Sequence, residues 1–267
     1  MSESLLARWR SRFWGAHETV SHGEWSRLCQ GSSLIARYAS VGRSRLRELC
    51  DAFLRRKQFE GARGLEVDDE IRLLIAAQAC IPILGLSLEW LDGWRSIIVY
   101  PGDFVVRRTT VDEAGVVSES DDPLSGEAWN RGPVIVSLEG VREDARGEYW
   151  GNLVIHEIAH KLDMCNGVAN GMPPLHRDMD RNRWTEVWSA AYDTLAEEYE
   201  RGWDPWVGEG ALEDPAEFFA TMSEAFFTCP SDLQDAHGEV YAELSRFYRQ
   251  HPAVRASPAR SDSSLWI

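Results

Sequence analysis

Apolar side chains recur at helical spacing through the first third of the chain. Between residues 24 and 58 they stand three or four positions apart, which predicts two or three amphipathic helices. Residues 31–33, Gly-Ser-Ser, interrupt this pattern and predict a break between helices. Residues 59–64 are predicted to form a short loop, after which Asp68 is placed to cap the start of another helix.

From residue 96 the pattern changes to that of strands. Residues 96–100 and 104–108 are rich in β-branched and aromatic side chains and flank Pro-Gly-Asp at 101–103, so they predict a hairpin. Residues 111–132 are acidic and rich in Ser, Gly and Asp, which predicts an exposed loop. A third strand is predicted over residues 134–138.

Helical spacing returns in the second half of the chain. It predicts helices around 147–164 and 182–201, and another that starts at Asp214. The pattern as a whole predicts an α+β fold, in which a small mixed sheet packs beside these helices and further helices lie at both ends.

The length of 267 residues and a hydrophobic content of 44% suit a single domain with a sizeable core. We expect this domain to cover residues 1–252 and to begin with a helical part at about 12–90. Residues 253–267 contain Ser and Pro and are predicted to form a disordered tail.

Charge and cysteine usage narrow the classes of function. The net charge is −15, whereas a nucleic-acid-binding protein needs a basic surface, so nucleic acid is excluded as a partner. The five cysteines are scattered and form no C-x-x-C pair, which argues against a disulfide framework and favours a cytoplasmic protein with reduced thiols. Polar residues and a proline interrupt the most apolar stretch, residues 71–88, so no membrane span is expected. Residues 1–14 lack the apolar segment of a secretory signal.

The strongest chemical signal is the sequence His-Glu-Ile-Ala-His at residues 156–160, inside an apolar helical run. Residues four apart on a helix lie on nearly the same face, so His156 and His160 can bind one zinc ion. Glu157 lies about 100° around the helix and is placed to act as a general base. With this composition, the pattern arises by chance with a probability of about 3% at most. The sequence therefore predicts one zinc ion per chain.

A catalytic zinc ion needs a third protein ligand, and the residues leave three candidates. Glu217 follows Asp214 and Pro215 at the start of a predicted helix, so it is equally well placed to complete a capping box. Glu224 lies seven residues further on the same face, where it could bind the metal or support a ligand. His176 lies in a predicted loop and is either a ligand or a surface histidine.

Asp163 follows His160 by three residues and lies on the same helix face. Metal-bound imidazoles usually donate their other N–H to a carboxylate or a carbonyl, and Asp163 is a candidate for that acceptor. The alternative is a solvated residue near the end of a helix.

Four segments together resemble the Mlc titration factor A family of zinc metallopeptidases. They are V-I-H-E-I-A-H-K-L-D-M-C-N-G at 154–167, D-P-A-E-F-F-A-x-x-S-E-A-F-F at 214–227, L-I-A-A-Q-A-C-I-P-I-L at 74–84 and W-R-S-I-I-V-Y-P-G-D-F at 94–104. The resemblance extends from about residue 12 to 252, in order and with matching separations. The family is similar to the catalytic domain of anthrax lethal factor, a zincin whose third ligand is a Glu.

This resemblance implies a zincin-like, aminopeptidase-type enzyme in the cytoplasm, which acts on a peptide or protein substrate. It implies that His156, His160 and Glu217 are the zinc ligands and that Glu157 is the general base. It also implies that the strand from Val134 to Ser137 is the edge strand along which an extended substrate pairs.

One position departs from the family pattern, which has a Tyr seven residues before the third ligand that is thought to stabilise the oxyanion. Here that position is Gly210. Loss of one such donor can lower the rate by about 10²–10³. Either Tyr199, Trp206 or another donor replaces it, or the protein is a weak peptidase.

The family is also named for a non-enzymatic role, the sequestration of a glucose-responsive transcriptional repressor. The alternative function is therefore a protein-binding regulator with weak or no peptidase activity, in which zinc is mainly structural. A repressor protein would then be its partner. The absence of the Tyr favours this alternative, whereas Glu157 favours the peptidase because a structural site has no use for a general base. Hydrolysis of another amide or an ester is a third possibility.

Overall fold

The computed structural model describes residues 19–102, 108–111, 117–120, 132–147, 150–203 and 205–253. Within residues 39–43 and the strands at 108–111 and 117–120, only the backbone is described. The predicted disordered tail lies outside the described residues except for Ala253, which is buried.

The N-terminal helices begin and end where the sequence predicts. Helix α2 (His22–Gly31) and helix α3 (Ser33–Arg56) are separated at Ser32, whose hydroxyl accepts a hydrogen bond from the N–H of Ile35 and so caps α3. Helix α4 (Asp69–Cys80) is capped by Asp68. Short polar side chains fix each of these starts because they satisfy N–H groups that have no partner within the helix.

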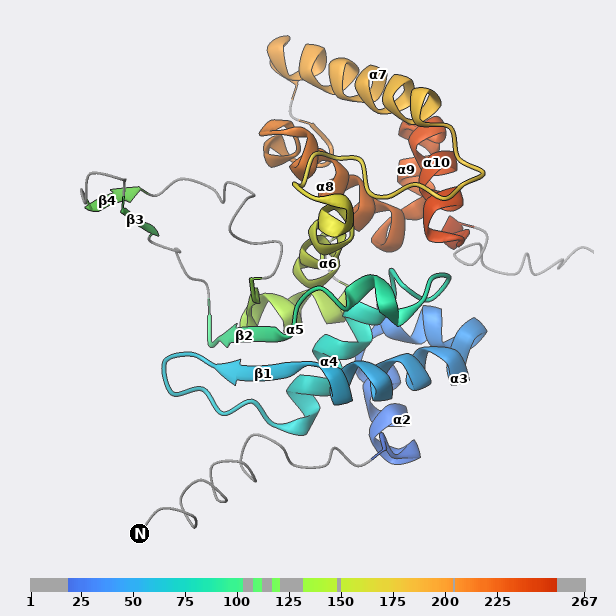
Figure 1. Ribbon diagram of the computed structural model, residues 1–267. Helices are drawn as coiled ribbons and strands as arrows, with labels where there is room; N and C mark the ends of the chain where they lie inside the picture. The colour runs from blue at the N-terminus through green and yellow to red at the C-terminus, as the bar shows by residue number, and fades with distance from the viewer. Residues whose placement is uncertain are drawn as a thin grey trace, which may run out of the picture.

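A three-stranded sheet packs beside these helices (Figure 1). Its strands β1 (Gln58–Gly61), β2 (Ser96–Tyr100) and β5 (Val134–Ser137) are all parallel, in the order β1-β2-β5. The prediction of a mixed sheet is therefore wrong for these strands, because α4 and later segments carry the chain back between them and so make them parallel. The predicted loop at 59–64 is also wrong, since β1 covers its first residues.

The predicted hairpin between 96–100 and 104–108 is not found among the described residues. Strand β2 is paired on both sides by parallel neighbours, and residues 104–107 lie outside the described part. A separate antiparallel pair is made by β3 (Arg108–Val111) and β4 (Val117–Ser120). The prediction of a loop over 111–132 is wrong at β4, and its remaining residues lie mostly outside the description.

The helix predicted over 147–164 begins later than predicted, and a helix that the pattern did not predict precedes it. Helix α5 (Leu138–Arg146) follows β5 directly and ends at Gly147, whose φ of 69° is a left-handed conformation that glycine adopts without strain. Helix α6 (Leu153–Asp163) starts later, at the N-cap Asn152.

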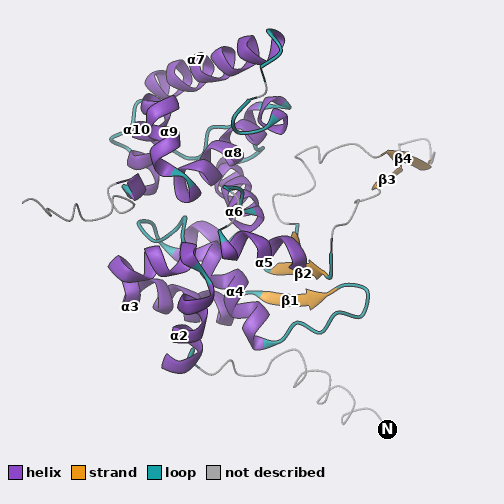
Figure 2. Ribbon diagram, turned by 180° about the vertical axis from the view of Figure 1, so that it is seen from behind, coloured by secondary structure: helices purple, strands orange, loops and turns teal. Residues whose placement is uncertain are grey.

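The C-terminal part is helical, and its predicted starts are confirmed. Helix α7 (Arg181–Glu200) and helix α8 (Pro215–Thr228) are followed by α9 (Pro230–Ala236) and α10 (Gly238–Tyr248). Figures 1 and 2 show these four helices on one side of α6, with the sheet and α2–α4 on the other. Helix α6 packs most extensively against α8. The buried apolar side chains form one cluster that extends from Val20 to Ala253. No helix among the described residues has the length and apolarity needed to cross a membrane.

Candidate metal centre

Helix α6 presents polar side chains from an otherwise buried apolar segment. Its start is fixed by Asn152, whose side chain accepts a hydrogen bond from the N–H of Ile155. Ile155, Ile158 and Leu162 are 0–1% exposed and hold the helix in the core. This packing fixes the direction in which the remaining face of α6 points.

His156 and His160 lie one turn apart on that face. Their ring centroids are 4.7 Å apart and their Nε2 atoms approach to 3.0 Å. Both side chains are mostly buried, with 20% and 14% of their surface exposed. The two imidazoles therefore direct the same ring nitrogen to one point.

Glu217 reaches the same point from the first turn of α8. Its Oε2 lies 3.1 Å from Nε2 of His156, and its Oε1 lies 3.1 Å from Nε2 of His160. The cap that competed with this role in the sequence is also present: Asp214 accepts from the N–H groups of Ala216 and Glu217. Only the backbone of Glu217 takes part in this cap, and its carboxylate is directed to the histidines. The side-chain bond that would complete the predicted capping box is not found among the described residues.

The charges of this cluster depend on one another. Burial alone would lower the pKa of His156, but hydrogen bonds to Glu217 and Glu224 outweigh it, so the pKa of His156 lies well above its ordinary value. Burial likewise tends to raise the pKa of Glu217, yet its contacts with His156 and His160 hold that pKa well below the usual range. The cluster therefore keeps the carboxylate of Glu217 negatively charged and stabilises a positive charge beside it.

The donor set fits a zinc ion. One ligand atom from each of His156, His160 and Glu217 lies within 4.8 Å of the others. A tetrahedral zinc ion with bonds of about 2.0–2.1 Å separates two ligand atoms by about 3.3–3.4 Å, close to the separations of 3.0–3.1 Å found here. Two ring nitrogens and the two oxygens of one carboxylate converge, and their lone pairs can be satisfied only by a shared cation or by additional protons.

Glu224 contacts the other side of the His156 ring. Its Oε1 lies 2.5 Å from Nδ1 of His156, and its Oε2 accepts a hydrogen bond from the N–H of Asn152 at 2.8 Å. Of the two roles that the sequence left open for Glu224, this position suits support of a ligand.

Two residues that the sequence analysis missed extend this network. The side-chain amide of Asn152 donates to Oε1 of Gln78 at 2.8 Å, and the amide of Gln78 donates to the carbonyl of Val141 at 3.1 Å. Gln78 is fully buried and Asn152 is 1% exposed. The sequence signal for Gln78 was a glutamine within the apolar run at 74–84. A buried amide needs hydrogen-bond partners, so such a residue predicts a polar contact in the core.

Asp163 lies at the end of α6 and binds a loop. Its Oδ2 accepts hydrogen bonds from the N–H groups of Asn170 and Gly171, at 2.8 and 2.7 Å. Burial raises the pKa of Asp163 to about 6, although these hydrogen bonds oppose the shift. No hydrogen bond to either histidine is found among the described residues, so its suggested role as an acceptor for a ligand stays a prediction.

Glu157 lies beside the cluster but takes no part in the contacts between its members. Its side chain is partly exposed, and no hydrogen bond to a described residue engages its carboxylate. Its charge acts on His156 and, one turn further along α6, on Lys161. A carboxylate so placed is available to accept a proton near the metal centre.

The remaining candidate residues have other contacts. His176 does not belong to the metal-binding cluster. Its Nε2 donates a hydrogen bond to the carbonyl of Phe247, 2.8 Å away. Strand β5 contains Val134 and Ser137 and has no described partner on the edge away from β2. The hydroxyl of Ser137 accepts a hydrogen bond from the N–H of Gly140 and so caps α5.

Gly210 lies in a short 3-10 helix (Glu209–Leu212) that packs against α8. The hydroxyl of Tyr199 donates to Oε2 of Glu209 at 3.0 Å, next to the position of the family Tyr. Trp206 instead packs against Trp150, with ring centroids 6.4 Å apart. Of the two suggested replacements, Tyr199 has a hydroxyl that contacts Glu209, the residue next to Gly210 in the chain.

Comparison with known proteins identifies the class. The sequence profile of a family described as "Glucose-regulated metallo-peptidase M90" matches residues 6–249, so the chain belongs to this metallopeptidase family. Mlc titration factor A of Salmonella arizonae is 35% identical over 257 residues, which cover 91% of this chain and 97% of the relative. That of Salmonella choleraesuis is 34% identical over 264 residues, or 93% and 96%. An uncharacterized protein of Synechocystis sp. is 36% identical over 214 residues, or 79% and 78%. The resemblance to the Mlc titration factor A family is confirmed.

Proposed function

We propose that this protein is a zinc-dependent peptidase of the zincin-like, aminopeptidase type. In this proposal His156, His160 and Glu217 hold one zinc ion per chain. The observation that carries the proposal is the convergence of two imidazole nitrogens and one carboxylate within 3.1 Å of one another. Membership of a metallopeptidase family supports it.

Each residue has a separate task in this proposal. When bound, zinc supplies Lewis acidity, which lowers the pKa of water and polarises a carbonyl. Glu157 accepts the proton of the attacking water and passes it to the leaving amine. Glu224 holds His156 through Nδ1, which directs Nε2 of the ring to the metal position. The edge strand β5, from Val134 to Ser137, pairs with the extended substrate.

We place the protein in the cytoplasm. All five cysteines are free thiols, which suits a reducing compartment. An aminopeptidase-type activity follows from the family resemblance and distinguishes this proposal from peptidases that cut inside a chain. The substrate class is accordingly peptides with an unblocked N-terminus.

Metal analysis and hydrolysis assays test the proposal together. Wild-type protein is expected to contain one zinc ion and to cleave unblocked aminoacyl substrates faster than blocked peptides. Glu157→Gln should retain zinc and lose hydrolysis. Glu217→Ala should lose zinc while it stays folded, since the cap made by Asp214 remains. Purified protein that takes up no divalent metal would contradict the proposal.

The alternative function is a protein-binding regulator, which sequesters a transcriptional repressor and has weak or no peptidase activity. It is favoured by Gly210, where the family pattern has a Tyr, and by the name of the relatives, Mlc titration factor A. Zinc bound without any hydrolysis above that of Glu157→Gln would support this alternative. If other amides and esters are assayed as well and none is hydrolysed faster than by Glu157→Gln, the third possibility, hydrolysis of such substrates, is excluded too.

A further inference from the structure

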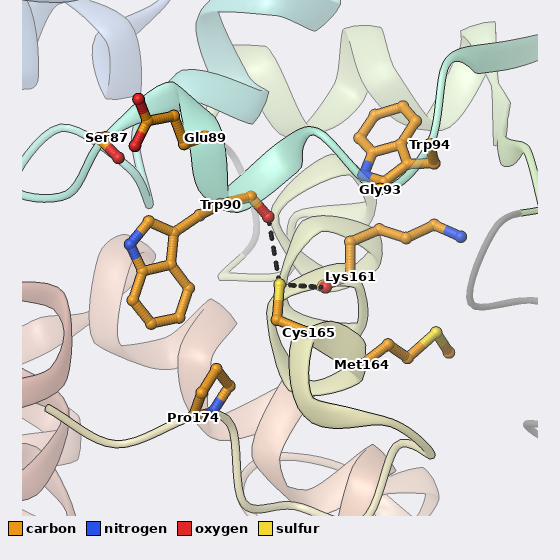
Figure 3. Close-up of a pocket in the computed structure, with 9 residues that line it drawn as sticks. All are labelled: Ser87, Glu89, Trp90, Gly93, Trp94, Lys161, Met164, Cys165 and Pro174. Atoms are coloured by element: carbon orange, nitrogen blue, oxygen red, sulfur yellow. Dashed lines mark hydrogen bonds between the residues drawn. The ribbon is translucent and has the colours of Figure 1, made fainter.

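A cavity of about 550 Å³ lies against the C-terminal end of α6 (Figure 3). This volume is in the range of pockets that bind small ligands or substrate side chains. Residues from three separate segments line it. The ones that matter for the argument are Trp90, Gly93, Trp94, Lys161, Met164 and Pro174.

The walls of this cavity combine apolar side chains with the polar side chains of Ser87, Glu89 and Lys161. Trp94 and Met164 are 4% and 9% exposed, and Trp90 and Pro174 supply a ring on the opposite side. The ammonium group of Lys161 donates to the carbonyl of Gly132 at 3.0 Å, which leaves its methylene groups to line the wall. The apolar part of this surface suits a large apolar or aromatic group.

The walls of the cavity are fixed by contacts with neighbouring rings and with one another. The ring of Trp90 packs against His176 and Phe247, each with a centroid separation of 5.7 Å. The thiol of Cys165 bonds to the carbonyls of Trp90 and Lys161, at 3.2 and 3.3 Å, as the dashed lines in Figure 3 show. These contacts tie the wall to the end of α6, so a ligand would enter a preformed site.

The cavity and the metal centre lie at successive positions along α6. Glu157 and Lys161 are four residues apart and share one face of this helix, and Met164 follows directly after its end. At about 1.5 Å per residue, Lys161 and Met164 lie about 6 and 10 Å along the helix from Glu157. An extended peptide rises about 3.3 Å per residue, so this distance corresponds to two or three residues of substrate.

We propose that this cavity is a specificity pocket that receives a large apolar or aromatic side chain, two or three residues from the scissile bond. The inference rests on the proposed peptidase function and adds a substrate class to it: peptides with Phe, Leu, Met or a similar residue near the cleavage site. Trp90, Trp94 and Met164 contact that side chain.

Gly93 offers a direct test because it lines the cavity and a Cβ at this position would meet nothing within 4 Å. Gly93→Phe should therefore fill the pocket without disturbing the backbone. Gly238→Phe is the matched control, since a Cβ there also meets nothing within 4 Å and Gly238 does not line the cavity. The substrates are unblocked peptides that carry Phe or Ala two or three residues from the scissile bond.

Wild type and Gly238→Phe should prefer the Phe peptide over the Ala peptide by about 10- to 100-fold in kcat/KM. In Gly93→Phe this ratio should fall towards one. Equal ratios in wild type and Gly93→Phe would overturn the pocket, even if hydrolysis itself confirms the peptidase.

Binding separates failure of the pocket from failure of the proposed function. The same peptides are titrated against the zinc-loaded Glu157→Gln protein, with and without Gly93→Phe. If no peptide is hydrolysed but the Phe peptide binds more tightly and Gly93→Phe removes that preference, the pocket stands and the peptidase proposal fails. Equal binding of the Phe and Ala peptides overturns the pocket.

Discussion

The Nδ1 atom of His156 lies 2.5 Å from Oε1 of Glu224, so a residue near the start of α6 is joined to one in the middle of α8. The other oxygen of Glu224 accepts from the N–H of Asn152, which precedes α6. A carboxylate on Nδ1 favours the tautomer with its proton there, which leaves Nε2 free to bind a metal ion.

Glu224→Gln should weaken zinc binding by about 10- to 100-fold, because the amide is a poorer acceptor for the Nδ1 proton. Competition with a chromophoric chelator measures the affinity. Glu213→Gln is the control, since Glu213 is exposed and lies four residues before Glu217. Equal zinc affinity in wild type and Glu224→Gln would show that the contact with His156 does not support the metal centre.

The metal ligands could be predicted from the sequence because their signal is local. His156 and His160 are one helical turn apart in one short motif, and spacing alone predicts that their side chains meet. Glu217 needed the family resemblance as well, because its position after Asp214 suited a cap just as well. In the structure Asp214 accepts from the N–H of Glu217, while the carboxylate of Glu217 contacts the histidines and does not complete the capping box.

Long-range features could not be predicted in this way. Gln78 and Asn152 are 74 residues apart and their hydrogen bond depends on how α4 packs beside α6. The error at β1 has a similar cause: the strand is four residues long and its pattern is weak, so its pairing with β2 decides its structure.

Gln78→Leu should lower the free energy of unfolding by about 1–3 kcal/mol. The substitution leaves the side-chain amide of Asn152 buried without its acceptor, and one unsatisfied group costs about 1–3 kcal/mol, whereas the carbonyl of Val141 lies within α5 and keeps its helical partner. Urea unfolding of the metal-free protein measures this loss. Gln58→Leu is the control, since Gln58 is exposed and should change stability by less than about 0.5 kcal/mol. Equal stability of Gln78→Leu and wild type would contradict the network.

Lys57 should titrate far below an ordinary lysine. Burial lowers the pKa of Lys57 from 10.5 to about 7, and the charge of Asp92 only partly opposes this. Its ammonium donates to the carbonyls of Leu91 and Trp94 and lies 3.5 Å from the centroid of the Trp94 ring. The sequence contains only one other lysine, Lys161. Protein labelled with ¹³C-lysine should therefore give two Cε signals, and Lys57→Met identifies one of them.

The lowered pKa of Lys57 determines how the free energy of unfolding depends on pH. Between about pH 7 and 10.5 the unfolded chain binds a proton at Lys57 that the folded chain has lost, so this group makes the folded state more stable as pH rises. The slope for one group is at most about 1.4 kcal/mol per pH unit. Urea unfolding from pH 7.5 to 9.5 should show a smaller rise for Lys57→Met than for wild type. A Lys57 signal that titrates only above pH 10 would contradict the prediction.

Gly171→Ala should destabilise the protein and weaken zinc binding together. Gly171 has a φ of +78°, and a Cβ there would lie 2.4 Å from the carbonyl oxygen of Pro215, two residues before Glu217. Its N–H also donates to Asp163, so the loop cannot move away without loss of that bond. Gly202→Ala is the control because Gly202 has a similar φ of +83° but open space around it, so only the conformational cost of about 1–2 kcal/mol applies. The clash should add about 1–3 kcal/mol in urea unfolding. If the two variants lose equal stability and bind zinc equally well, the contact between this loop and the start of α8 does not position Glu217.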